Sequence, residues 1–180
     1  MKKLLLNLAI LTLITLHFSG CDLFGKKEEP KPKTELEKLP PITQEGKNTF
    51  GCLVNGKAWV AATQTDAVAF YQLGTLQISG NLSQPARSVG ITLRDEGIPI
   101  NTGKYSLIPT IRTCSSAGLA INQFTTCLYD CSNTLFGQIE ISKLDRKNYI
   151  VSGTFEFSTV VSGCDTLKIT NGRFDIKYIP

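Results

Sequence analysis

The stretches LFGQIEI, residues 135–141, and VSGTFEF, residues 151–157, decide the fold. In each stretch every second residue is apolar or glycine, and most residues between them are polar. This two-residue period is typical of a strand with one buried face. A five-residue loop, residues 144–148, would place both apolar sets on the same face of an antiparallel hairpin. The two stretches therefore predict a long hairpin, from which the rest of the fold can be built outward.

Strand and turn signals recur on both sides of this hairpin. The segments 50–54 and 57–60 flank Asn55-Gly56, a pair typical of a two-residue type I′ turn, so Cys52 is expected opposite Trp59. Alternation also marks residues 76–82 and 89–93, and Gly103 begins a further strand.

The C-terminal segment carries the last of these signals. Asn171-Gly172 lies between two alternating stretches, 167–169 and 174–178, and predicts a final hairpin. Sustained helical periodicity is absent from the sequence. We therefore predict one all-β domain over residues 46–180, an antiparallel β-sandwich or small flattened barrel built of consecutive hairpins.

The first twenty residues have the pattern of an export signal. Met1-Lys2-Lys3 is cationic, residues 4–16 are mostly apolar, and Phe18-Ser19-Gly20-Cys21 resembles the lipobox of bacterial lipoproteins. The resemblance implies removal of residues 1–20 and acylation of Cys21, which would anchor the chain to a membrane. The alternative is an ordinary signal peptide followed by a cysteine without a special role.

Residues 21–45 are expected to form a lipid-anchored, disordered tether. Lys, Glu, Pro and Thr dominate this stretch, which has no apolar periodicity with which to bury surface. Lys26-Lys27-Glu28-Glu29 resembles a signal that sends lipoproteins of Bacteroidota to the cell surface, and a solvated charge run is the alternative. We expect the protein at the bacterial outer membrane, on its periplasmic or its surface side, with the surface favoured.

Residues 39–180 resemble, at their two ends, an uncharacterised lipoprotein family of Bacteroidota. LPPIT, residues 39–43, and NTFGCLVNG, residues 48–56, are similar to its beginning. SGTFEF, residues 152–157, and NGRFDI, residues 171–176, are similar to its end. This family is a domain of unknown function, so the resemblance implies a location and a fold and supplies no catalytic residue.

Removal of residues 1–20 would change the charge and the available chemistry. Loss of Lys2 and Lys3 lowers the 19 basic residues to 17, against 15 acidic residues. This small excess is not clustered, so nucleic acid is not expected as a partner. The single histidine, His17, would also leave. Its loss excludes Ser-His-Asp and Cys-His catalysis and His-ligated metals, and we expect no cofactor.

Five cysteines lie in the expected domain, and in an oxidising compartment pairing is the default. Extension of the long hairpin sets Cys131 opposite Val161, close to Cys164, so Cys131–Cys164 is the first predicted disulfide. Cys114–Cys127 is the second, and would close a local loop.

The fifth cysteine, Cys52, faces the expected core and is predicted to be a buried free thiol. A zinc site made of the four other cysteines is the alternative. Within that set Cys127 and Cys131 have a suitable spacing, but a second such pair is missing.

A pair of carboxylates is the remaining route to catalysis. The predicted register aligns Glu156 with Phe136, four residues from Glu140, so the two acids are expected ~13 Å apart, beyond the ~5–9.5 Å of glycosidase pairs. Both are then solvent-side strand residues. Four other acids are of types common in turns: Asp66, Asp95, Glu96 and Asp130.

Two further patterns suggest surface chemistry. Tyr71, Tyr105, Phe124 and Tyr129 could line a carbohydrate or peptide platform, although scattered aromatic residues are more typical of packing between strands. Asp165-Thr166-Leu167 resembles an O-glycosylation acceptor of Bacteroidota envelope proteins, with an Asp-Thr turn before a strand as the alternative.

We therefore predict a non-catalytic lipoprotein of the cell envelope, a binding or structural module held at the outer membrane through Cys21. We expect a monomeric domain whose partner is an envelope protein or a glycan. The alternative is a carboxylate-dependent glycan hydrolase at the cell surface. An enzyme of that kind needs two acids that converge in a cleft, whereas a binder needs an exposed polar or aromatic patch.

Overall fold

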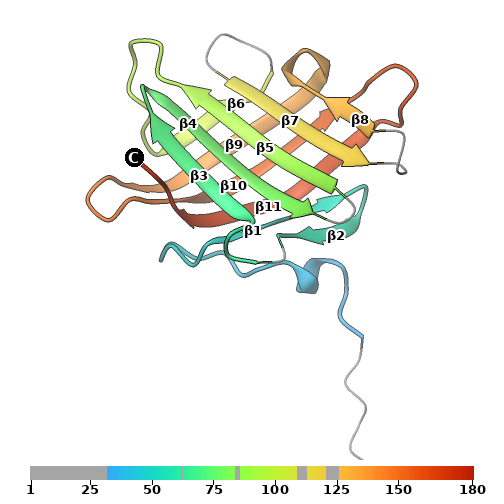
Figure 1. Ribbon diagram of the computed structural model, residues 1–180, viewed down its shortest axis with the longest axis horizontal. Helices are drawn as coiled ribbons and strands as arrows, with labels where there is room; N and C mark the ends of the chain where they lie inside the picture. Colours follow the sequence, from blue (N-terminus) through green and yellow to red (C-terminus); the bar gives the residue numbers. More distant parts are fainter. Residues whose placement is uncertain (1–31, 62, 84–85, 109–112, 121–125) are drawn as a thin grey trace, which may run out of the picture. The chain divides into compact units, whose positions relative to one another are not determined.

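Two antiparallel sheets stack face to face around a shared core (Figure 1). The computed structural model describes residues 32–61, 63–83, 86–108, 113–120 and 126–180, with the backbone alone at 83, 86, 114–120 and 126. Sheet A has the order β2 (Lys57–Val60), β1 (Thr49–Val54), β11 (Leu167–Lys177), β10 (Ile150–Thr159), β9 (Thr134–Asp145), β6 (Gly103–Ser106). Sheet B has the order β3 (Ala67–Gln72), β4 (Thr75–Ser83), β5 (Ala86–Arg94), β7 (Thr113–Ala120), β8 (Thr126–Tyr129). The predicted antiparallel β-sandwich is confirmed.

Phenylalanine rings fill the core where sheet A carries inward-facing glycines. Phe155 lies opposite Gly172, and Phe174 lies opposite Gly153. A Cβ added to Gly172 would lie 2.6 Å from the Phe155 ring, so the missing side chain makes room for the ring. Phe155 also contacts Phe50, with ring centroids 5.1 Å apart. The glycines in the alternating pattern are therefore packing positions of the core rather than breaks in the strands.

The long hairpin forms, but its predicted register is wrong. Its loop has four residues, because Ile150 pairs with Asp145, and a four-residue loop alone would turn one apolar set outward. A shift in the pairing follows at once: Ser152 pairs with Lys143 and Gly153 with Ile141, which leaves one extra residue on β9. This bulge returns both apolar sets to the core.

The predicted final hairpin is also wrong, because its two halves form one continuous strand, β11. Asn171, with a φ of +52°, sits at a pairing irregularity against both neighbours, β1 and β10. The inward-facing positions change there from Leu167 and Ile169 to Gly172 and Phe174. A bulge and a two-residue turn both shift the inward-facing positions by one residue along the chain. The pair Asn-Gly is suited to either of them.

The first hairpin is confirmed. Cys52 pairs with Trp59, and Asn55 and Gly56 both have positive φ, as a type I′ turn requires. Phe50, Cys52 and Trp59 are buried, with the Phe50 and Trp59 rings 5.9 Å apart. This hairpin closes one edge of sheet A.

Residues 34–47, here called the strap, run along the outer face of sheet A. The strap contains a short 3₁₀ turn, η1 (Leu36–Lys38), and one buried apolar side chain, Leu39. The backbone N–H of Ala58 on β2 donates to Glu35 at 2.7 Å. At its other end Lys143 on β9 donates to the backbone carbonyl of Gln44 at 2.8 Å. Part of the expected tether is thus folded onto the domain. Polar contacts hold it there, and such contacts leave no apolar periodicity in the sequence.

Candidate functional site

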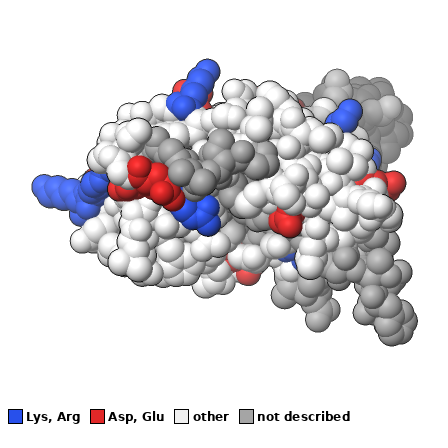
Figure 2. Space-filling model, turned by 90° about the horizontal axis from the view of Figure 1, so that it is seen from above, with Lys and Arg blue, Asp and Glu red and all other residues white. Residues whose placement is uncertain are grey.

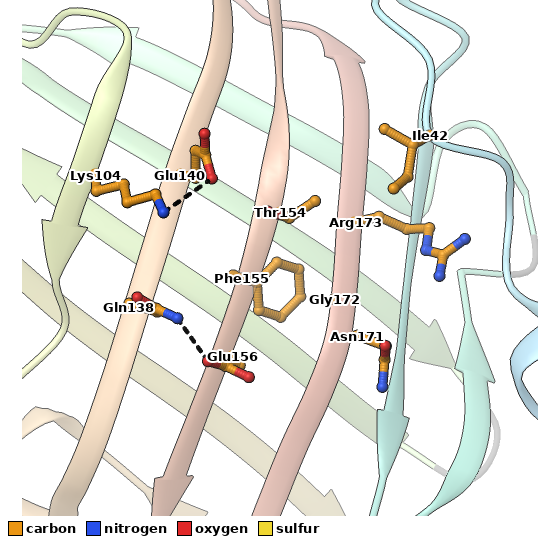
Figure 3. Close-up of a pocket in the computed structure, with 10 residues that line it drawn as sticks. All are labelled: Ile42, Lys104, Gln138, Glu140, Thr154, Phe155, Glu156, Asn171, Gly172 and Arg173. Atoms are coloured by element: carbon orange, nitrogen blue, oxygen red, sulfur yellow. Dashed lines mark hydrogen bonds and ion pairs between the residues drawn. The ribbon is translucent and has the colours of Figure 1, made fainter.

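A hollow of about 300 Å³ opens on the outer face of sheet A (Figure 3). Four neighbouring strands, β6, β9, β10 and β11, supply its floor, and Ile42 of the strap supplies part of its side. Its lining residues are Ile42, Lys104, Gln138, Glu140, Thr154, Phe155, Glu156, Asn171, Gly172 and Arg173.

Strand alternation explains why polar side chains gather here. Gln138 and Glu140 alternate on β9 with the buried residues Ile139 and Ile141, and Thr154 and Glu156 alternate on β10 in the same way. The bulge between Ser152 and Gly153 sets the register that pairs Thr154 with Glu140 and Glu156 with Gln138. The hollow therefore depends on the same local irregularity that keeps the core apolar.

Charged and amide groups in the hollow face one another in pairs. Gln138 Nε2 donates to Glu156 Oε1 at 2.6 Å, and Lys104 Nζ lies 3.8 Å from Glu140 Oε2 (Figure 3). Both members of the second pair are exposed, with 71% of the Lys104 side chain and 50% of the Glu140 side chain accessible. This ion pair therefore contributes little to stability, and its groups can be redirected to a ligand.

Arg173 connects the hollow to the strap. Its Nη1 donates to the backbone carbonyl of Pro40 at 3.1 Å, while its Nε is buried and has no hydrogen-bond partner. A buried N–H without an acceptor is costly, and a ligand oxygen could satisfy it only after a shift of the Arg173 side chain. Arg173 thus supplies both a strap contact and an unused donor.

Asp175, two residues beyond Arg173 on β11, fixes the C-terminal end of the strap. Its side chain is 1% exposed and accepts hydrogen bonds from Thr43 Oγ1 at 2.6 Å and from Ser152 Oγ at 2.7 Å. Three successive backbone N–H groups, those of Glu45, Gly46 and Lys47, donate to the same carboxylate at 3.0, 2.7 and 3.2 Å.

Burial alone would raise the pKa of Asp175. The hydrogen bonds from Thr43, Ser152, Glu45 and Gly46 outweigh that effect and lower the pKa to about 2. Asp175 is therefore ionised at neutral pH, and as an anion it binds the strap more strongly than a neutral group would.

The predicted separation of Glu140 and Glu156 is wrong. Glu156 pairs with Gln138 rather than Phe136, so the two acids are diagonal neighbours on adjacent strands, with backbones ~7–8 Å apart. Both line the hollow. The error comes from the position of the loop, which is formed by residues 146–149 rather than 144–148, and the bulge on β9 offsets only one residue of that shift.

The predicted disulfide pairing is wrong, although three of the four cysteines are disulfide-bonded. Cys164 bonds to Cys127, with Cα atoms 6.2 Å apart, and Cys131 is also in a disulfide. The side chain of Cys114 lies outside the described residues. Cys131 does not continue β9 as expected, since residues 131–133 form the 3₁₀ turn η2, capped by Asp130. Sheet B instead carries Cys127 to the loop that holds Cys164, where Tyr129 donates to the Asp165 carbonyl at 2.7 Å.

Cys52 is a buried free thiol, as predicted. Burial raises its pKa to about 12, so it stays protonated and unreactive at neutral pH. Its location beside Trp59 in the core assigns it to packing rather than to chemistry.

The four aromatic residues considered for a platform do not form one among the described residues. Tyr129 is buried, Tyr71 packs edge-to-face with Tyr178, and the Tyr105 hydroxyl donates to the Asn101 carbonyl. Phe124 lies outside the described residues, as do Cys21 and residues 26–29.

Other predicted surface residues lie away from the hollow's lining. Thr166 is exposed, and its carbonyl accepts from the Asn55 side chain at 3.4 Å. The acids Asp66, Asp95 and Asp130 accept backbone N–H groups in turns, as their residue type indicates.

Sequence patterns did not identify the strap residues or their acceptor. Asp175 lies on the outer face of β11 and would be assigned to solvent by alternation alone. Its burial depends on strap residues that have no strand or helix periodicity. Alternation predicts that Gln138, Glu140, Thr154 and Glu156 point outward. That they line one hollow depends on the register of β9 against β10, which alternation does not give.

The described residues contain no group of three or more His, Cys, Asp or Glu that could hold a metal ion. Within the same residues, no helix has the length and apolar character needed to cross a membrane. On the face drawn in Figure 2, the described cationic and anionic side chains form small mixed groups separated by uncharged surface.

No curated protein and no solved structure matches the chain. The family model described as "Domain of unknown function (DUF6252)" matches residues 47–176, which cover both sheets from the start of β1 almost to the end of β11. The chain therefore belongs to the DUF6252 family.

Proposed function

We propose that this protein is a lipid-anchored binding module of the bacterial cell envelope, and that the hollow on sheet A binds a hydroxyl-rich ligand such as a glycan. The observation that carries the proposal is the hollow itself, where carboxylate, amide, hydroxyl and guanidinium groups from four strands converge. Such a mixed set of donors and acceptors matches the hydroxyl groups of a sugar, each of which donates and accepts.

The form of the hollow favours binding over a purely structural role. Its side chains come from rigid strands, which hold polar groups more accurately than loops do. The exposed Lys104–Glu140 pair supplies a donor and an acceptor that contribute little to the stability of the fold. A ligand can therefore make these contacts without breaking the core.

The lipid anchor is supported by the export-type leader and by Cys21 in its lipobox-like setting. Twelve residues, 22–33, separate that cysteine from the strap, and fully extended they reach ~40 Å. Mass spectrometry of the N-terminal peptide of the protein expressed in a bacterial envelope should find Cys21 as the first residue, carrying acyl chains. Cys21→Ser should remain unacylated. An unmodified residue 21 in the unsubstituted chain would contradict the anchor.

Saturation-transfer NMR tests the hollow. The full chain in mild detergent is mixed with maltotetraose, chitotetraose or tetragalacturonate. We expect transfer to at least one of these sugars and its loss on Gln138→Ala. The matched control is Gln77→Ala, the same substitution at an exposed position of β4 on the outer face of sheet B. Equal loss in both variants, or no transfer to any sugar, would refute the assignment of the hollow.

A glycan hydrolase is the second candidate, favoured by the presence of Glu140 and Glu156 in one hollow. Against it, the acid of such a pair usually sits in an apolar pocket, whereas Glu140 is half exposed and lies beside Lys104. Incubation with the same three tetrasaccharides separates the candidates. Release of shorter sugars that Glu140→Gln or Glu156→Gln abolishes would establish the hydrolase, and intact sugars that still bind would support the binding module.

A further inference from the structure

We propose that the strap is a working part of the hollow, so that ligand binding and the seating of the strap on sheet A reinforce each other. This inference rests on the proposed function, because it takes the hollow as the ligand site and the strap as the segment that leads to the anchor. The coupling regulates the same site: a pull on the tether that lifts the strap weakens binding, and a bound ligand resists the lifting.

Two contacts carry the coupling. Ile42, on the strap, lines the hollow directly. Arg173 lines it from β11 and is held by the carbonyl of Pro40, two residues before Ile42. Figure 3 shows Ile42 and Arg173 close together at one side of the hollow. Lifting the strap would remove this side and release the guanidinium group, so the lifted form offers a ligand fewer fixed contacts.

The strap can lift without unfolding the sandwich. Leu39 is its one buried apolar side chain, and its other holds are polar contacts at separate points. The strongest is Asp175, which binds Thr43 and the backbone N–H groups of residues 45–47. A segment with so little apolar burial opens locally at a lower free energy than the core strands do. The N–H groups of residues 45–47 then report on each opening.

Linkage fixes the size of the expected effect. A ligand that binds the seated form alone stabilises it by RT ln(1 + [L]/Kd), so at a ligand concentration of 100 Kd the strap opens ~100-fold less often. Residues 45–47 do not line the hollow. Slower exchange of their amides is therefore not a direct shielding effect of the ligand.

Hydrogen exchange with mass spectrometry on the full chain in detergent tests the coupling, using the tetrasaccharide that gives the strongest saturation transfer. At 100 Kd we expect the amides of residues 45–47 to exchange ~100-fold more slowly. The Gly97 amide, which donates to Asp95 at 2.9 Å in a turn outside the hollow's lining, is the control and should be unchanged. Asp175→Asn should exchange faster at residues 45–47 without ligand, and bound sugar should still slow that exchange.

The outcomes separate the two proposals. If Gln138→Ala removes binding but bound sugar leaves residues 45–47 unchanged, the strap is passive and this inference alone fails. If bound sugar slows Gly97 as much as residues 45–47, the effect is global and the inference also fails. If no tetrasaccharide binds, the proposed ligand class and this inference fail together.

Discussion

The Asp175 carboxylate gives the sharpest prediction about stability, because its pKa sets both a magnitude and a pH window. Its pKa falls from an ordinary value of 3.8 to about 2 in the folded protein. That difference of about 1.8, at ~1.36 kcal/mol for each pKa unit, amounts to ~2 kcal/mol of stability carried by the ionised form.

The sign follows from the lowered pKa. The contribution is complete above the unfolded value of 3.8 and disappears as the pH falls through about 2. Asp175→Asn removes the charge while keeping the size of the side chain. We therefore expect this variant to lose ~2 kcal/mol in its free energy of unfolding at neutral pH, and the loss to shrink steadily as the pH falls from 4 toward 2.

Urea denaturation at a series of pH values measures this difference. The control is Asp95→Asn, which alters an Asp that likewise accepts a backbone N–H, that of Gly97, but lies in a turn that the hollow and the strap do not involve. It should change the free energy of unfolding by less than ~0.5 kcal/mol. A loss for Asp175→Asn that is equally large at neutral pH and near pH 2 would refute the argument, because the effect would then not come from the charge.

Three further predictions concern the core and the cysteines. Gly172→Ala should cost ~1–3 kcal/mol in urea unfolding, because its Cβ would lie 2.6 Å from the Phe155 ring, and Phe155→Leu in the same chain should recover part of this loss. Cys52 should resist iodoacetamide in the folded protein at pH 8 and react only in denaturant, as followed by mass spectrometry, since burial raises its pKa to about 12. Replacing Cys127 and Cys164 together by Ser should lower the free energy of unfolding by ~4 kcal/mol, because their disulfide closes a loop of 37 residues; a loss below ~1 kcal/mol would contradict that account.

The fold class was readable from the sequence because alternation and Asn-Gly pairs are local signals. The hairpin of β1 and β2 was predicted down to the pairing of Cys52 with Trp59. Asn171-Gly172 shows the limit of such signals, since the same dipeptide makes a turn in one place and a bulge in the other. Local sequence does not distinguish them, because the choice depends on the strands that pair alongside.

The candidate site was less predictable for a related reason. The loop of the long hairpin lies at residues 146–149 rather than 144–148, and the bulge near Ser152 offsets only part of this shift. The register and the distance between Glu140 and Glu156 therefore both differ from the prediction. The disulfide partners were misassigned because residues 131–133 form the turn η2 instead of continuing β9. The burial of Asp175 could not be predicted, because the strap groups that donate hydrogen bonds to it belong to a segment without strand or helix periodicity. Errors of register thus changed the predicted long-range pairings, while the predicted inward and outward faces of β9 and β10 stayed correct.

The C-terminal residues complete sheet B as well as ending sheet A. Ile179 forms a parallel bridge with Phe70, donating to the carbonyl of Ala69 and accepting from the N–H of Tyr71 at 2.9 and 2.8 Å. It thereby occupies hydrogen-bonding groups on the outer edge of β3 that would otherwise be free to recruit a strand from another molecule. Trimming residues 179–180, which leaves the buried Tyr178 in place, should consequently increase precipitation by intermolecular sheet growth, and purification tags are better placed elsewhere.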